Sequence, residues 1–336
     1  MKNIKEMSAP DRARYLGTPE QMYSVRRVKL EDGRAKNTTE FEVQTGGGLS
    51  YTVLADNGLD IGTLSYRGVN MSYLTKNGST SPYLAETYEN GFSKYFPAGM
   101  VYTCGMLSVG GGNRDADQWH TTHGRYHLLP AREVCGEVCG DVISVRGKIR
   151  ESELFGHCLE VVREVTSEVG GSELVITDIL TNQTPNPTEF MMLYHCNFGY
   201  PFLDENLKLI LPKGTNTRGR TPLATERIAT HSKFGKPIDN DEETVYFHEI
   251  PAKDGCKTVR AENTALGIGM EMTFSAETLP ILAEWKCMRS GEYVLGLEPT
   301  NCYIMGRADE RKNGTIQTVA PFASVKMQVK IRFYDL

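Results

Sequence analysis

Histidine is the first residue type to consider, because imidazole transfers protons near neutral pH. The chain has seven histidines, and three of them, His120, His123 and His127, fall within eight residues. If that segment is extended, His123 and His127 share a face and His120 does not. With Glu298 these three could supply the ligands of a metal ion. Hydrogen-bonded histidines in a core or a turn are the alternative, and the residues alone leave both open.

A fourth histidine, His195, lies in a short segment rich in aromatic and polar residues, at positions 194–201. On an extended chain its side chain points away from those of Tyr194 and Cys196 and to the same side as that of Asn197. This alternation predicts that His195 and Asn197 face one environment and that their neighbours face another.

Glu298 is the carboxylate most suited to proton transfer. It follows the apolar residues Gly296 and Leu297 and precedes Pro299, which is expected to end the strand and start a loop. A carboxyl group at the end of a buried strand loses water, which raises its pKa toward that of a useful base. A glutamate that caps the following turn is an equally good interpretation of the spacing.

An aromatic residue lies on the preceding strand, in the segment Ala283-Glu-Trp-Lys286. Trp285 could stack on the face of a sugar ring or fill the core. Because the register of the hairpin is ambiguous by one residue, the sequence does not decide whether Trp285 or Lys286 shares a face with Glu298.

Glycine clusters do not indicate a nucleotide site. The runs at 46–48 and 110–112 fit neither the GxGxxG nor the GxxxxGK[ST] pattern, and no strand followed by a helix surrounds them. Tight turns or close backbone approaches explain them better.

Period-two alternation of apolar and polar residues is the dominant pattern of the elements that must position these groups. It predicts strands at 159–165, 174–180, 244–250, 281–287, 293–297 and 325–333. Helical periodicity is confined to residues 9–24, where Pro10 and Pro19 favour two short helical turns. Many strands at short spacing, without intervening helices, predict an all-β sandwich or barrel. We expect a single domain over residues 1–336 with an N-terminal extension at 1–25.

Composition excludes several classes of partner. The 37 basic and 42 acidic residues give a net charge of −5 without long runs, which argues against a nucleic-acid partner and a polybasic membrane patch. The N-terminal residues contain no apolar signal region, and no run approaches the roughly 20 apolar residues that span a bilayer. The eight cysteines are therefore expected to be reduced thiols in the cytoplasm.

Several segments together resemble a known family. In chain order they are Gly58-Leu-Asp-Ile-Gly62, Tyr102-Thr-Cys-Gly-Met106, His123-Gly-Arg125, Tyr194-His-Cys-Asn-Phe-Gly199, Glu284-Trp-Lys286 and Gly296-Leu-Glu-Pro-Thr-Asn301. The set is similar to the aldose 1-epimerase-like branch of the galactose mutarotase superfamily, over about residues 20–336. The resemblance implies a β-supersandwich of two large antiparallel sheets, with a sugar cleft on a concave face.

The resemblance also implies roles for single residues. Glu298 corresponds to the catalytic base, His195 to the catalytic acid and His123 to a second, substrate-binding histidine. The other expected pocket residues are Arg125, Asn197, Lys286 and Trp285. No metal ion or other cofactor is expected.

The activity implied is that of an aldose 1-epimerase, which interconverts sugar anomers by opening and closing the ring. Arg125 and Lys286 would suit a phosphorylated or acidic sugar, since arginine pairs with such groups through two hydrogen bonds. Another sugar enzyme on the same scaffold, such as an epimerase at a different carbon, a lyase or a hydrolase, is an alternative, as is a carbohydrate-binding protein without activity. Exposed edge strands of a large sandwich favour a homodimer.

Overall fold

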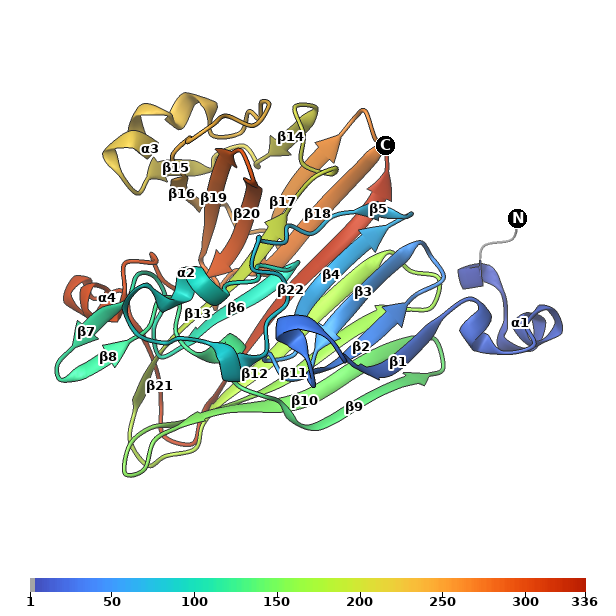
Figure 1. Cartoon of the computed structure of the whole chain (residues 1–336), viewed down its shortest axis with the longest axis horizontal. Helices are drawn as coiled ribbons and strands as arrows, with labels where there is room; N and C mark the ends of the chain where they lie inside the picture. The colour runs from blue at the N-terminus through green and yellow to red at the C-terminus, as the bar shows by residue number, and fades with distance from the viewer. Residues whose placement is uncertain (1–3) are drawn as a thin grey trace.

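Two large antiparallel sheets make up the computed structural model, which describes residues 4–336 (Figure 1). The larger sheet has 12 strands. In spatial order its main path is β1 (Ser24–Lys29), β2 (Thr39–Gln44), β3 (Leu49–Leu54), β4 (Asp60–Tyr66), β6 (Val101–Met106), β13 (Thr188–Phe198), β20 (Glu292–Thr300), β19 (Ile281–Arg289), β16 (Thr244–Glu249) and β15 (Asn216–Gly219), with β5 (Val69–Asn70) beside β4 and β21 (Gln317–Val319) beside β13.

The second sheet has eight strands and contains the most regular alternation in the sequence. In spatial order they are β14 (Leu207–Ile210), β17 (Cys256–Asn263), β18 (Ile268–Ser275), β22 (Ser324–Asp335), β12 (Glu173–Asn182), β11 (Cys158–Glu168), β10 (Val142–Ser152) and β9 (Arg132–Cys139). A separate hairpin pairs β7 (Asn113–Asp115) with β8 (Gln118–His120).

Helices are short and lie in the connections between strands. The α-helices are α1 (Ala9–Tyr15), α2 (Phe92–Tyr95), α3 (Pro222–Glu226) and α4 (Arg307–Asn313). The 3-10 turns are η1 (Ile4–Glu6), η2 (Pro19–Gln21), η3 (Gly33–Ala35), η4 (Pro82–Leu84), η5 (Glu89–Gly91), η6 (Tyr126–Leu128) and η7 (Ile228–Thr230). Over residues 4–336 none of these helices has the length and apolar character needed to cross a membrane.

Alternation along the strands builds the core between the two sheets. In β22 the side chains of Met327, Val329, Ile331 and Phe333 are buried, while the residues between them are more exposed. The ring of Phe333 stacks on that of Tyr66 of the larger sheet, with centroids 5.7 Å apart. All six strands predicted from periodicity are present, and the all-β sandwich prediction is confirmed.

The N-terminal segment forms the two short turns that its prolines favour. Ser8 caps α1 by accepting a hydrogen bond from the backbone N–H of Asp11. Arg12 of α1 pairs with Asp141, next to the β9–β10 hairpin. Residues 1–3 of the expected extension lie outside the described residues.

The larger sheet also carries apolar side chains on its outer face, turned away from the second sheet. A second core cluster forms there, and it includes Tyr102 and Leu193 of the central strands, Phe247 of β16 and Phe96. Residues from 71–98 and 107–124, together with Arg220 and residues 241–243, lie over this face. These segments, rather than the second sheet, enclose the candidate site.

Candidate active site

His195 and Glu298 are cross-strand neighbours in the centre of the larger sheet. The β13–β20 register pairs Leu193 with Thr300 and Cys196 with Leu297, which places His195 directly opposite Glu298. The distance between Nε2 of His195 and Oε1 of Glu298 is 3.1 Å, a close contact without hydrogen-bond geometry, and Oε1 has no hydrogen-bond partner among the described residues. Two residues more than a hundred positions apart therefore meet because their strands are adjacent.

Pro299 does not end its strand, contrary to the expectation from the sequence. Strand β20 continues to Thr300, and Pro299 pairs with Leu282 of β19. The bridge pairs between β13 and β20 are interrupted between Leu193–Thr300 and Cys196–Leu297. A residue without an N–H group is tolerated inside a sheet at such an interruption.

Small residues next to Glu298 make room for its side chain. Ala283 of β19 pairs with Glu298, and Trp285 pairs with Gly296. This register puts Trp285 on the same face as Glu298 and Lys286 on the opposite face, which resolves the ambiguity of the sequence. A Cβ atom at Gly296 would lie 2.5 Å from Oε1 of Glu298, so only glycine leaves that space free.

An open cavity of about 810 Å³ lies above the pair. This volume is within the range of small-molecule sites in proteins, roughly 300–1,000 Å³. His195 and Glu298 are 5% and 2% exposed, so they form its floor. His123 and Trp285 line the wall, with ring centroids 5.7 Å and 5.2 Å from that of His195. The cavity thus combines aromatic faces with a buried acid–imidazole pair.

Burial changes the pKa of the two floor residues in opposite directions. Loss of water lowers the pKa of His195 to about 3, with a smaller contribution from His123. Loss of water raises the pKa of Glu298 well above its usual value; nearby Arg220 lowers it and Glu243 raises it, both by less. Burial therefore favours the neutral pair, a protonated carboxyl group beside a neutral imidazole.

Charged groups that the sequence analysis did not single out lie in the cavity wall. Arg220 and Glu243 are 4.0 Å apart, and Oε2 of Glu243 accepts a hydrogen bond of 2.7 Å from Nε1 of Trp285. Arg289 also lines the wall, and its buried Nε has no hydrogen-bond partner among the described residues. Arg220 and Glu243 lie in irregular chain at the ends of β15 and β16, where no local pattern indicates a function.

Three of the expected pocket residues lie outside this cavity. Arg125 lines a separate hollow of about 170 Å³. Asn197 shares the face of His195 but is fully buried and donates hydrogen bonds to the carbonyl groups of Gly99 and His195.

Lys286 is the third. It points to the other face of the sheet and donates to the carbonyl groups of Thr230 and Lys233, at 2.8 and 2.6 Å. Its side chain is thus occupied by the connection that follows β15, and it is unavailable to a ligand in the cavity.

The histidines of the 120–127 segment separate from one another. His120 lines the smaller hollow, His123 lines the cavity, and His127 is buried with its Nδ1 2.6 Å from Oδ2 of Asp60. The expected shared face of His123 and His127 is wrong, because a turn at Gly124 and the 3-10 turn η6 separate them. These residues and Glu298 do not converge as metal ligands.

One family model matches most of the chain, at residues 36–333, and is described as a domain of unknown function, DUF4432. The chain belongs to this family. None of the curated proteins compared with it matches significantly.

Solved structures share the fold of this DUF4432 member. A Klebsiella pneumoniae protein, named as a candidate aldose 1-epimerase, has a TM-score of 0.88 at 23% identity, covering 93% of this chain and 84% of its own. A galactose mutarotase-like protein from Clostridium acetobutylicum has a TM-score of 0.66 at 13% identity, covering 94% and 100%. Galactose 1-epimerase from Lactobacillus acidophilus has a TM-score of 0.62 at 13% identity, covering 93% and 99%. They confirm the mutarotase-like fold that the sequence motifs indicate.

Proposed function

We propose that this chain is a carbohydrate-active isomerase of the aldose 1-epimerase kind, acting on a small sugar in the cytoplasm. The observation that carries the proposal is the 3.1 Å contact between Nε2 of His195 and Oε1 of Glu298 at the floor of a cavity large enough for a pyranose. Mutarotation needs one proton donor and one proton acceptor on the same sugar, and this pair supplies both.

In the proposed reaction the proton of the neutral pair first moves from Glu298 to His195. Glu298 then removes the proton of the anomeric hydroxyl while His195 protonates the ring oxygen. The C1–O5 bond breaks, the aldehyde group rotates, and closure on its other face inverts C1. After opening, Glu298 carries the proton and His195 is neutral, which is the form that burial favours. The two residues then exchange roles as the ring closes.

Residues of the wall would hold the sugar. The rings of Trp285 and Phe96 present flat apolar faces, which suit the C–H face of a pyranose. His123 is within reach of the same space and would bind a hydroxyl group. None of these steps requires a metal ion or another cofactor.

The test is an NMR assay of anomer exchange on several sugars, corrected for the spontaneous rate. Glu298→Gln should reduce the catalysed rate by about 10²–10⁴-fold, because the amide cannot accept the proton. Glu271→Gln, which removes a surface carboxylate paired with Arg332 on the second sheet, is the matched control and should leave the rate unchanged. Full activity of the Glu298 variant would remove this residue from the mechanism.

Product analysis in the same samples separates the alternatives. A new double bond indicates a lyase, a released sugar a hydrolase, and inversion at another carbon a different epimerase. Sugar binding by calorimetry without exchange above background indicates a binding protein.

A phosphorylated or acidic sugar remains part of the proposal, with a different cation. Arg220 lies in the cavity wall, 4.0 Å from Glu243, whereas Arg125 and Lys286 lie elsewhere. An anionic substituent would compete with Glu243 for the guanidinium group. Arg220→Gln should then raise KM for the anionic sugar about tenfold or more, as expected for loss of a hydrogen bond to a charged group, and leave KM for the neutral sugar nearly unchanged. Equal KM changes for both sugars would show that Arg220 does not recognise a charge.

A further inference from the structure

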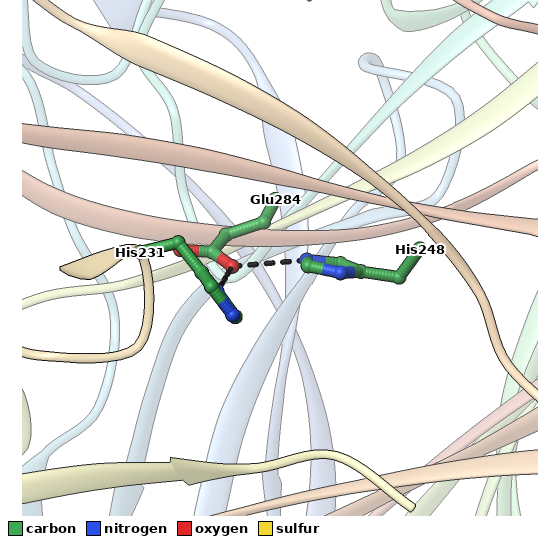
Figure 2. Close-up of side chains that lie close together, drawn as sticks. All are labelled: His231, His248 and Glu284. Atoms are coloured by element: carbon green, nitrogen blue, oxygen red, sulfur yellow. Dashed lines mark hydrogen bonds and ion pairs between the residues drawn. The ribbon is translucent and has the colours of Figure 1, made fainter. Parts of the chain in front are cut away.

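Three titratable residues meet on the face of the larger sheet opposite the cavity, and the proposed reaction uses none of them. They are His231, His248 and Glu284 (Figure 2). Over residues 4–336 they form the sole group of three or more such side chains whose donor atoms all lie within 4.8 Å of one another.

Two adjacent strands and one turn position this cluster. Glu284 of β19 pairs with Tyr246 of β16, so His248, two residues further along β16, lies diagonally across from it on the same face. His231 follows the 3-10 turn η7 and approaches from the connection that covers this end of the sheet. The cluster therefore joins the 220–243 segment to the sheet.

Both imidazoles converge on a single oxygen atom. Nδ1 of His231 is 2.8 Å and Nε2 of His248 is 2.9 Å from Oε2 of Glu284. His248 and Glu284 are completely buried, whereas the side chain of His231 is 16% exposed. The cluster is thus enclosed by the sheet and reachable from solvent on one side.

The other carboxylate oxygen provides an independent observation. Oε1 of Glu284 is buried and has no hydrogen-bond partner within residues 4–336. A buried acceptor without a donor is costly, by about 1–3 kcal/mol, and native proteins rarely leave one without a function or a bound group. Two imidazole nitrogens thus contact Oε2 of this carboxylate, while none of the described residues donates to Oε1.

We propose that His231, His248 and Glu284 bind a divalent transition-metal ion of the zinc class. Two imidazole nitrogens and a carboxylate are a donor set that zinc accepts, whereas magnesium and calcium prefer oxygen ligands alone. Oε1 of Glu284 would gain a partner if the carboxylate binds through both oxygens. Water, entering beside His231, would complete the coordination.

Thr217 is placed to support His248 in this role. Its Oγ1 lies 2.9 Å from Nδ1 of His248, across the β15–β16 ladder. A hydroxyl group can accept a hydrogen bond from Nδ1–H, which leaves Nε2 unprotonated and free to bind a metal ion. Metal-bound histidines commonly have such a partner on their second nitrogen.

The consequence reaches the cavity through the 220–243 segment. Arg220 at its start and residues 241–243 at its end line the cavity wall, while His231 lies between them. A metal ion at the cluster would fasten the middle of this segment to β16 and β19. The site would be structural and would set the position of the cavity wall, which is a property beyond the proposed sugar chemistry.

Metal binding is tested directly, in a Cys135→Ser/Cys139→Ser background that removes the two exposed thiols. After chelator treatment the full chain is titrated with Co²⁺, whose visible d–d bands report nitrogen and oxygen ligands, and with Zn²⁺ by calorimetry. We expect one ion per chain, and loss of this binding in Glu284→Gln and in His231→Asn. His157→Asn removes a histidine outside the cluster, and this variant should bind the metal ion as tightly as the parent does.

Two further measurements complete the test. Thr217→Val should weaken the affinity by about 10–100-fold, as expected for loss of a partner to a metal-bound histidine. Zn²⁺ should raise the Tm of the parent and not that of His231→Asn, a variant at a partly exposed position that is expected to fold. Absence of stoichiometric metal binding, or metal binding that persists in both cluster variants, would overturn the proposal. The three residues would then be only a hydrogen-bonded triad.

Discussion

At the scale of single residues, the site depends on His195 and Glu298. Burial disfavours the charged form of both side chains. The sequence alternation predicted that His195 points away from Tyr194, and the structure agrees: the Tyr194 hydroxyl donates to Asp178 on the inner side. Contact between His195 and Glu298 could be expected only from the family resemblance, because the residues are far apart in the chain. Arg220 could not be predicted, since it lies in irregular chain after β15, and Arg289 could not be assigned to the cavity because it ends β19 without a local motif.

Acid should destabilise this protein partly through His195. In the unfolded chain this imidazole binds a proton below its ordinary pKa of about 6.5, whereas in the folded chain its pKa is about 3. The unfolded state therefore holds more protons between these values, and stability falls as the pH falls. The expected slope is about 1.4 kcal/mol per pH unit between pH 6 and 4.

Urea unfolding of the parent and of His195→Gln at several pH values measures this contribution. Subtracting the two curves cancels most other titrating groups, and the parent should lose stability faster than the variant on acidification. Parallel curves would mean that His195 is solvated or charged in the folded protein.

At the scale of elements, the alternating pattern predicted where the strands are. The separate prediction that Pro299 ends a strand was wrong. Residues 325–333 alternate so regularly that they predict β22 without ambiguity, and Pro10 predicts the helical turn found as α1. Pro299 appeared to end β20, because a sequence does not reveal an interruption in the pairing of two strands. The face that Trp285 occupies depends on the β19–β20 register, which tertiary structure determines.

Gly296 of β20 should be intolerant of a side chain for a reason specific to the site. An added Cβ would lie 2.5 Å from Oε1 of Glu298 and 3.0 Å from Cβ of Trp285, so the carboxylate would have to move. We expect Gly296→Ala to cost roughly 1–3 kcal/mol of stability and to reduce anomer exchange by about 10²-fold, as for a misplaced catalytic group.

Gly17→Ala is the matched control, because a Cβ there meets nothing within 4 Å. Denaturation and the exchange assay are performed on both variants. A fully active Gly296 variant would indicate that the position of the Glu298 carboxylate does not limit the reaction.

At the scale of the whole molecule, a buried ionic network links the two sheets beneath the site. Arg163 of β11 is fully buried and pairs with Asp178 of β12 through two hydrogen bonds, at 2.9 and 2.7 Å, and with Asp60 of β4 at 2.6 Å. Thr103 and His127 also bond to Asp60. Sequence patterns predicted apolar sheet interiors, and this polar centre could not be predicted because its members come from five separate segments.

Replacing Arg163 should be among the most damaging single changes. Arg163→Leu leaves two buried carboxylates without their cation, which costs about 3–5 kcal/mol in comparable sites. Arg332→Leu removes an exposed arginine from its pair with Glu271 and should cost less than about 1 kcal/mol. Urea unfolding compares the two, and similar losses would show that the network contributes no more than a surface ion pair.

The two floor residues and the cavity walls belong to different parts of the molecule. His195 and Glu298 sit on adjacent inner strands, where hydrogen bonds on both sides restrict backbone movement. The walls come largely from the loops between strands, which can change in length and composition without disturbing the hydrogen bonds of the sheet. Changes in these loops can therefore alter ligand preference while His195 and Glu298 are retained. Libraries aimed at new specificities should randomise the loops and leave β13 and β20 unchanged.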